Sequence, residues 1–436
     1  MNVFDTQRIL DVLSKMGYAE TGDPAMADLI LVNTCSVRAQ PEQKVLGTLS
    51  RLLPLKEFNP HLRFGICGCV AQQYGHDLLD RIHYADLVFG PDNIKDLPDL
   101  LPPVERGDRL ARTSRMARAS YEFMPLDIAN RPGPCAFLTI MKGCDKVCTY
   151  CIVPRVRGRE VSKPAELVLA EAVRLVAAGV REITLLGQNV NAYGHDLPGQ
   201  PGFGTLLEQI DAVPGLARLR FVTSHPADAD DAMITAFKRL PRLAPALHLP
   251  LQSGSDRVLA GMRRGYTAAE YLDKVAALRS ASPDIALSTD IIVGFPGETA
   301  EDFRRTLEVV ETAQYDTLFS FKYSPRPGTT AARRRDDCPA AEKAARLKEL
   351  QTMQDEITAR RMQRFLGRIE EVLVEGPSAM AHQAGHCGEW AGRTRTNWVV
   401  NFVPSPDGMP RPGDLVQIRI DTIMAHCLRG TAYSAS

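Results

Sequence analysis

Six short apolar segments follow one another between residues 136 and 324, and stretches with helical periodicity fill most of the gaps between them. One such stretch starts at Pro164 and ends at Gly179, with proline at the start and glycine at the end, as is typical of a helix. Successive strand–helix units predict parallel strands, and six of them indicate a complete or partial barrel whose reactive face is the carboxyl end of its strands. The six segments are residues 136–141, 182–187, 219–224, 246–251, 285–295 and 317–324.

The first hundred residues also alternate between helical stretches and apolar segments. The run "ADLILVNTC" ends at Cys35, "RFGICGC" ends at Cys69, and "ADLVFG" follows, after a helical stretch that begins at Phe4. Alternation of this kind predicts a parallel sheet with ligands at the carboxyl ends of its strands. Cys35 and Cys69 are therefore expected on one edge of that sheet.

These patterns predict an α/β chain of four parts. Residues 1–105 form a parallel α/β domain, residues 106–132 form a Pro-, Arg- and Ser-rich linker, and residues 133–365 form a partial (β/α)6 barrel. Residues 366–436 contain β-branched runs separated by "PSPDGMPRPGD", which predicts a small β-barrel of the oligonucleotide-binding type. A purely structural cap is the alternative for that last part.

Composition describes a globular protein of several domains. The 436 residues are 44% hydrophobic and 24% charged. No apolar run approaches the roughly 20 residues that span a bilayer, and the start lacks the pattern of a signal peptide, so a cytoplasmic location is expected. The net charge of zero gives no general electrostatic argument for a nucleic-acid partner.

The stretch "GCDKVCTYC" holds Cys144, Cys148 and Cys151 in the spacing C-x3-C-x2-C. A structural zinc site uses four protein ligands, whereas a metal centre with three protein ligands keeps one coordination position open. Three thiolates favour a soft metal centre, and a four-iron, four-sulfur cluster bound by three cysteines would leave one iron with an open coordination position. A zinc ion with a distant fourth ligand remains the alternative.

Polar residues follow the predicted strands of the barrel, where such enzymes keep their sites. Each could instead satisfy the backbone of a loop. The candidate cofactor or substrate contacts are Gln188, Asn189, Ser224 and Gln252.

The cysteine motif, with Tyr150 directly before its last cysteine, is similar to the signature of the radical S-adenosylmethionine superfamily. The whole chain resembles the tRNA-modifying methylthiotransferases of that superfamily. The final module resembles a TRAM domain, which is a small RNA-binding β-barrel. The resemblance rests on "NTCSVR", "GCVAQQ", "GCDKVCTYCIVPRVRGREVSKP", "LLGQNVNAYG", "TSHP", "HLPLQSGSDRVL", "DIIVGFPGET", "YSPRPGT" and "RTRTNWVVNF".

This resemblance implies two [4Fe-4S] clusters and S-adenosylmethionine as cofactors. Cys144, Cys148 and Cys151 would bind the first cluster, with Tyr150 beside the cofactor, and Cys35 and Cys69 would bind the second. The family's third ligand to the second cluster lies in a stretch that would precede Met1, and no strand precedes the helix at Phe4. We therefore expect that the sequence begins too late, by a strand and a cysteine.

The remaining cysteines have no such role. Cys67 could substitute for the missing ligand, but its position within a strand-like run favours a buried thiol. The cysteines expected to be ordinary thiols are Cys135, Cys338, Cys387 and Cys427.

The implied reaction inserts a methylthio group at C2 of N6-dimethylallyladenosine at position 37, next to a tRNA anticodon. The implied partners are the tRNA anticodon stem-loop, with Arg393 and Arg395 as RNA-binding candidates, and an electron donor such as a flavodoxin-type protein. No separate acid or base residue is assigned. The alternatives are a sister methylthiotransferase acting on a ribosomal protein aspartate or on threonylcarbamoyl-adenosine in tRNA, and a non-catalytic metal-containing RNA-binding protein.

Overall fold

The computed structural model describes residues 2–35, 41–117, 121–124, 133–199, 201–381, 388–405 and 408–433. Cys387 and part of the predicted linker lie outside these residues. The chain forms two compact units. The first contains residues 1–130, 142–147 and 151–161, and the second contains residues 131–141, 148–150 and 162–436.

The first unit is built on a parallel four-stranded sheet, as the alternating pattern predicts. Its strands, in spatial order, are β1 (Leu29–Thr34), β2 (Arg63–Gly68), β3 (Leu87–Phe89) and β4 (Leu110–Arg112). Strand β4 lies within the range predicted as a linker, so the sheet extends further along the chain than the sequence indicated. Only three residues of β4 join the ladder, which is too short for a periodic pattern to show.

Helices cover this sheet with two apolar clusters. Phe64 and Ile66 of β2 pack with Leu49, whereas Cys67 packs with Ile9 and other apolar residues in a separate cluster. Because successive side chains of a strand point to opposite faces, Cys67 faces away from Ile66. The helices of this unit are α1 (Asn2–Lys15), α2 (Pro41–Leu52), α3 (Leu55–Phe58), α4 (Cys69–Tyr74), α5 (Asp77–Arg81), α6 (Leu97–Glu105) and α7 (Val153–Val156).

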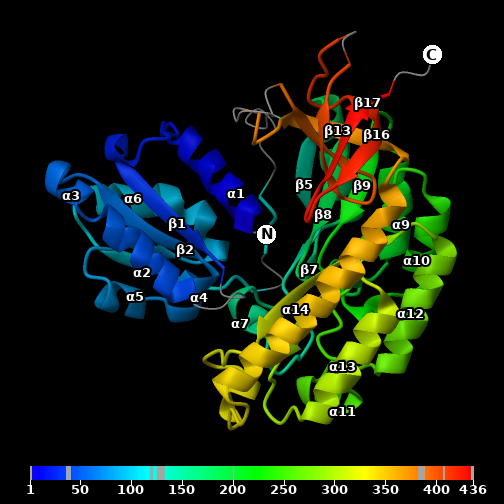
Figure 1. Ribbon diagram of the computed structural model, residues 1–436. Coiled ribbons are helices and arrows are strands. Elements are labelled where there is room, and N and C mark those ends of the chain that lie inside the picture. The colour runs from blue at the N-terminus through cyan, green and yellow to red at the C-terminus, as the bar shows by residue number, and fades with distance from the viewer. Residues whose placement is uncertain are drawn as a thin grey trace. The chain divides into compact units, whose positions relative to one another are not determined.

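The second unit begins with the six predicted parallel strands. They form two three-stranded sheets, which a parallel bridge between Leu219 and Leu243 connects. Helices follow the strands along the chain and lie outside them (Figure 1). The strands are β5 (Cys135–Thr139), β8 (Glu182–Leu186), β9 (Arg218–Phe221), β10 (Ala246–His248), β11 (Ala286–Val293) and β12 (Thr317–Lys322). Two short strands, β6 (Met141–Lys142) and β7 (Val161–Ser162), flank the cysteine loop.

The helices of this unit supply the apolar faces that pack on the strands. Helices α12 and α13 each begin with a capping box, at Thr267 and Thr299. No helix among the described residues is both long and apolar enough to cross a bilayer. The helices are α8 (Ala165–Ala177), α9 (Phe203–Asp211), α10 (Asp231–Arg239), α11 (Asp256–Met262), α12 (Ala268–Ala281), α13 (Ala300–Ala313) and α14 (Ala340–Met362).

The second unit ends in a closed five-stranded barrel, which confirms the predicted small β module. Its core includes Phe365, Trp398, Phe402 and Ile420. The strands run in the order β13-β14-β15-β17-β16 and are β13 (Ile369–Pro377), β14 (Trp390–Thr394), β15 (Val399–Val403), β16 (Leu415–Ile423) and β17 (Leu428–Ala432).

Candidate functional site

The loop that carries Cys144, Cys148 and Cys151 follows β5 and β6, as predicted for a motif after the first barrel strand. It opens with Gly143 at φ +76°, where a Cβ would overlap the carbonyl oxygen of Arg159. The backbone N–H of Cys144 donates to the carbonyl of Gly158 at 3.2 Å. Glycine is thus required for the loop to start next to the returning chain.

Cys148 belongs to the second unit and has two nitrogen donors beside its sulfur. Arg264 Nη1 lies 3.4 Å from Cys148 Sγ, and His225 Nε2 lies 4.0 Å from it. His225 Nδ1 accepts a hydrogen bond from the backbone N–H of Ala227 at 3.2 Å. In a neutral imidazole the proton is therefore assigned to Nε2, which faces the sulfur.

Arg264 is buried, and its guanidinium is held by neutral acceptors. It donates to the carbonyl of Pro250 at 2.7 Å and to the hydroxyl of Tyr266 at 2.9 Å. Burial works to lower the pKa of Arg264, but Tyr150, Tyr266 and Cys148 hold that pKa well above its ordinary value. The side chain is therefore a permanent cation next to a cysteine sulfur.

Thr149 and Tyr150 fix the middle of the cysteine loop to α11. Thr149 Oγ1 donates to the carbonyl of Gly261 at 3.0 Å, and its N–H donates to the carbonyl of Met262 at 3.0 Å. Tyr150 packs against the cluster that contains Met262 and Phe295. These contacts orient Cys148, which directly precedes Thr149.

The other candidates lie after the strands, where the sequence placed them. Asn189 Nδ2 donates to Asp228 at 2.7 Å, and Gln188 precedes it in the same loop. The Ser224 hydroxyl is buried and has no hydrogen-bond partner among the described residues. Gln252 is buried, and its φ of +78° is a strained backbone conformation for a residue with a side chain.

Cys35 and Cys69 lie side by side in the first unit. Thr34 of β1 is paired with Gly68 of β2, so the two cysteines are the next residues of adjacent parallel strands. Gly68 has φ +87°, and a Cβ there would overlap atoms of β1. Glycine before the cysteine again allows the close approach.

Cys69 also has a buried arginine beside its sulfur. Arg157 Nε lies 3.3 Å from Cys69 Sγ, and the same guanidinium forms an ion pair with Asp5. Burial raises the pKa of the Cys69 thiol, and the charge of Arg157 opposes that rise. The side-chain oxygen of Asn2 also accepts a hydrogen bond from Arg157 Nη2, at 3.4 Å.

Cys67 has different surroundings from Cys69, although only Gly68 separates them. Its side chain is fully buried in the apolar cluster under β2. Burial, with a smaller contribution from Asp5, raises the pKa of the Cys67 thiol far above its ordinary value. A neutral thiol in an apolar core fits the interpretation of Cys67 as a structural residue.

A buried ion pair precedes the cysteine loop. Lys142 Nζ lies 2.7 Å from Asp92 Oδ1 and 3.5 Å from the ring centroid of Tyr121. Sequence reasoning missed Lys142, Asp92, Arg157 and Arg264. Lys142 and Arg157 lie beside the cysteine motif in the sequence, which was the one available signal for them, and Asp92 and Arg264 had no such signal.

The two RNA-binding candidates of the final module are engaged within the second unit. Arg395 Nη2 donates to the carbonyls of Pro241 and Leu243 at 2.5 and 3.3 Å, and Arg393 Nε donates to Glu375 at 2.9 Å. From the parallel strands, Arg218 and Arg220 donate to backbone carbonyls of β14 and the turn after it. Backbone carbonyls bound by arginine therefore fix the small barrel to the parallel strands.

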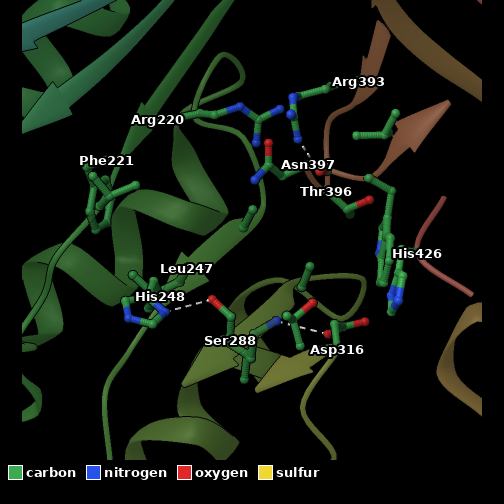
Figure 2. A pocket seen from close by; sticks show the side chains of 17 residues that line it. Arg220, Phe221, Leu247, His248, Ser288, Asp316, Arg393, Thr396, Asn397 and His426 are labelled. Carbon is green, nitrogen blue, oxygen red and sulfur yellow. Dashed lines mark hydrogen bonds between the residues drawn. The ribbon is translucent and has the colours of Figure 1, made fainter. Parts of the chain in front are cut away.

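A pocket of about 260 Å³ lies at this junction. Thr396, Asn397 and His426 of the small barrel line one side, and residues of β9 to β12 line the other (Figure 2). His248 lies between Ser288 Oγ, 3.0 Å from Nδ1, and Asp290 Oδ2, 3.4 Å from Nε2.

The donor set fits an iron–sulfur cluster. Sulfur ligands of such clusters accept hydrogen bonds, and both Cys69 and Cys148 have a guanidinium donor beside them. Within the described ranges, no three His, Cys, Asp or Glu side chains are grouped to hold a single metal ion.

Comparisons with known proteins agree with this arrangement. The Radical SAM superfamily matches residues 138–310, the "Uncharacterized protein family UPF0004" matches residues 1–90, and the TRAM domain matches residues 363–433. A radical S-adenosylmethionine methyltransferase, TsrM from Kitasatospora setae, has a similar fold with a TM-score of 0.57, at 16% identity, over 76% of this chain and 74% of that one.

Two curated relatives match at much higher identity. The tRNA-2-methylthio-N(6)-dimethylallyladenosine synthase of Geobacter metallireducens is 46% identical over 96% of this chain and 93% of its own length. The protein of the same name from Burkholderia mallei is 44% identical over 99% of this chain and 94% of its own length. The chain therefore belongs to the family of tRNA-2-methylthio-N(6)-dimethylallyladenosine synthases, within the radical S-adenosylmethionine superfamily.

Proposed function

We propose that the chain is a tRNA methylthiotransferase that inserts a methylthio group at C2 of N6-dimethylallyladenosine at position 37, beside the anticodon. The near full-length similarity to relatives named for this activity carries the proposal. The TRAM match supports tRNA as the substrate. An electron donor such as a flavodoxin-type protein would supply reducing equivalents.

Cys144, Cys148 and Cys151 would hold one [4Fe-4S] cluster, and Cys35 and Cys69 would contribute to a second. When bound, these groups would supply the electron that cleaves S-adenosylmethionine and the sulfur that is transferred. A strong aromatic C–H bond cannot be ionised by a side-chain base, so no acid or base residue is assigned.

The residues of this chain position and solvate those groups. Arg264 and His225 direct N–H groups at Cys148, and Thr149 anchors the loop to α11. Gln188, Asn189, Ser224 and Gln252 are the proposed contacts to cofactor or substrate, with Tyr150 beside the cofactor. The buried hydroxyl of Ser224, which has no hydrogen-bond partner in the part of the chain that the structure describes, is suited to form a hydrogen bond with a ligand.

The first test is reductive cleavage of S-adenosylmethionine by the reconstituted protein. Cys144→Ala, Cys148→Ala and Cys151→Ala should each abolish 5′-deoxyadenosine formation while the protein stays folded. Cys135→Ala is the matched control, because Cys135 lies in β5, outside the loop, and should leave the activity unchanged. If a variant with all three cysteines replaced still cleaves S-adenosylmethionine, the assignment is wrong.

The second test identifies the substrate. Mass spectrometry of tRNA nucleosides from a strain that lacks the gene should show N6-dimethylallyladenosine without its methylthio group, and the gene should restore the group. Loss of a methylthio group from threonylcarbamoyl-adenosine, or from a ribosomal protein aspartate, would instead identify a sister activity. A protein that binds tRNA but never cleaves S-adenosylmethionine would be a non-catalytic RNA-binding protein.

A further inference from the structure

Each proposed cluster site contains a buried arginine that donates to a cysteine sulfur. Arg264 Nη1 lies 3.4 Å from Cys148 Sγ, and Arg157 Nε lies 3.3 Å from Cys69 Sγ. Arg264 is 5% exposed and Arg157 is 7% exposed. Water therefore screens neither charge strongly.

The two arginines differ in their counter-charge. Arg157 forms an ion pair with Asp5, which is itself buried. Arg264 donates to the Pro250 carbonyl and the Tyr266 hydroxyl, both neutral, and contacts no carboxylate in the part of the chain that the structure describes. The site of Cys148 thus carries an uncompensated positive charge, whereas at Cys69 the charge is neutralised.

We infer that Arg264 is a positioning residue that raises the reduction potential of the cluster held by Cys144, Cys148 and Cys151 above that of the second cluster. The inference rests on the proposed cluster assignment. Reduction adds one negative charge to a cluster, so a nearby cation and N–H donors to its sulfur ligands stabilise the reduced state. The His225 Nε2, 4.0 Å from the same sulfur, acts in the same direction.

The difference decides which cluster receives an electron first. A one-electron donor reduces the cluster with the higher potential, and here that cluster is the one that must reduce S-adenosylmethionine. The second cluster, where Asp5 cancels the charge of Arg157, stays oxidised at the same solution potential. The arrangement thus directs the single electron to the sulfonium-cleaving site.

The decisive variant is Arg264→Gln, in a chain that also carries Cys35→Ala and Cys69→Ala, so that only the first cluster can load. The cluster midpoint is measured by electron paramagnetic resonance during a redox titration. We expect the ratio of reduced to oxidised cluster at fixed potential to fall about tenfold, which is 59 mV for a one-electron couple. Arg264→Lys keeps the positive charge, so its midpoint should lie between those of the parent and Arg264→Gln. If Arg264→Gln does not load iron, the midpoint of Arg264→Lys provides the test.

Arg279→Gln is the matched control. Arg279 is a half-buried arginine of the same unit that donates to the carbonyls of Ala313 and Gln314, so its loss should leave the midpoint unchanged. In the unsubstituted protein, the Cys148 cluster should be reduced before the second cluster, and Asp5→Asn should raise the midpoint of the second.

The outcomes separate this inference from the proposed function. Iron-loaded variants with an unchanged midpoint, or clusters reduced in the opposite order, would overturn the role of Arg264 and leave the cluster assignment standing. A parent chain that binds no iron at Cys144, Cys148 and Cys151 would overturn the proposed function itself.

Discussion

Gly143 lies so close to the carbonyl oxygen of Arg159 that a Cβ on Gly143 would overlap it. Gly143→Ala must also adopt φ +76°, which costs about 1–2 kcal/mol for a residue with a side chain. We expect the loop to shift at Cys144 and iron to fall from about four to below about two per chain in a protein with only the first cluster. Iron analysis of the purified, reconstituted variant measures this.

Gly158 provides the control for that variant. It has φ +80°, but no atom of the described residues lies within 4 Å of the position that its Cβ would take. Gly158→Ala should therefore cost only the backbone strain and keep its iron. Equal iron content in the two alanine variants would show that the overlap at Gly143 is relieved without consequence.

Cys67 and Cys69 should respond differently to substitution, although they are two residues apart. Cys67→Ala leaves a small cavity in an apolar cluster and should cost about 1–2 kcal/mol of stability without loss of iron. Cys69→Ala should lower the iron content of the second cluster, because it removes a proposed ligand sulfur, the one that accepts a hydrogen bond from Arg157. Thermal unfolding and iron content measure the two effects, and iron loss in Cys67→Ala would make that residue a ligand.

The RNA-binding assignment of Arg393 and Arg395 predicts a smaller salt dependence of tRNA affinity when either is replaced by Gln. Each lost phosphate contact should reduce the slope of log K against log salt concentration by about 0.7–0.9. Arg395→Gln should also lower the unfolding temperature, because Arg395 binds the carbonyls of Pro241 and Leu243. Arg419→Gln, on β16 beside Asp421, is the control. If both variants show the same slope as the parent, the two arginines have only structural roles and do not bind RNA.

Asp302 gives the stability of the second unit a dependence on acid pH. Burial raises the pKa of this carboxyl, but hydrogen bonds from Arg257, Ser255 and Thr299 outweigh it and hold the pKa well below its ordinary value. A depressed carboxyl pKa stabilises the fold above the unfolded pKa, near 3.9, and this stability is lost as pH falls through the folded pKa.

Asp302→Asn should therefore cost about 2–3 kcal/mol at pH 7, and its difference from the parent should shrink as the pH falls below about 4. Unfolding temperatures of both proteins between pH 7 and pH 2.5 measure this. Glu301→Gln, an exposed neighbour on α13, should change stability little at any pH. A difference that stays constant down to pH 2.5 would place the contribution of Asp302 in packing rather than charge.

The sequence by itself predicted the six parallel strands, the sheet that brings Cys35 and Cys69 together, and a small β-barrel at the end. These elements follow from local periodicity, and the cysteine loop follows from the short spacing C-x3-C-x2-C. A few neighbouring residues encode both kinds of pattern. The sequence did not predict β4, because three residues of an edge strand carry no period.

Only the tertiary structure brought the arginines to the sulfurs. Arg264 is 116 residues from Cys148 along the chain, and Arg157 is 88 residues from Cys69. A charge acts strongly only where folding removes water around it, and no local pattern records which distant side chains share that place. The spacing C-x3-C-x2-C thus predicted a metal centre at Cys144, Cys148 and Cys151. The ion pair of Arg157 with Asp5, and the lack of a carboxylate beside Arg264 among the described residues, became visible only in the folded chain.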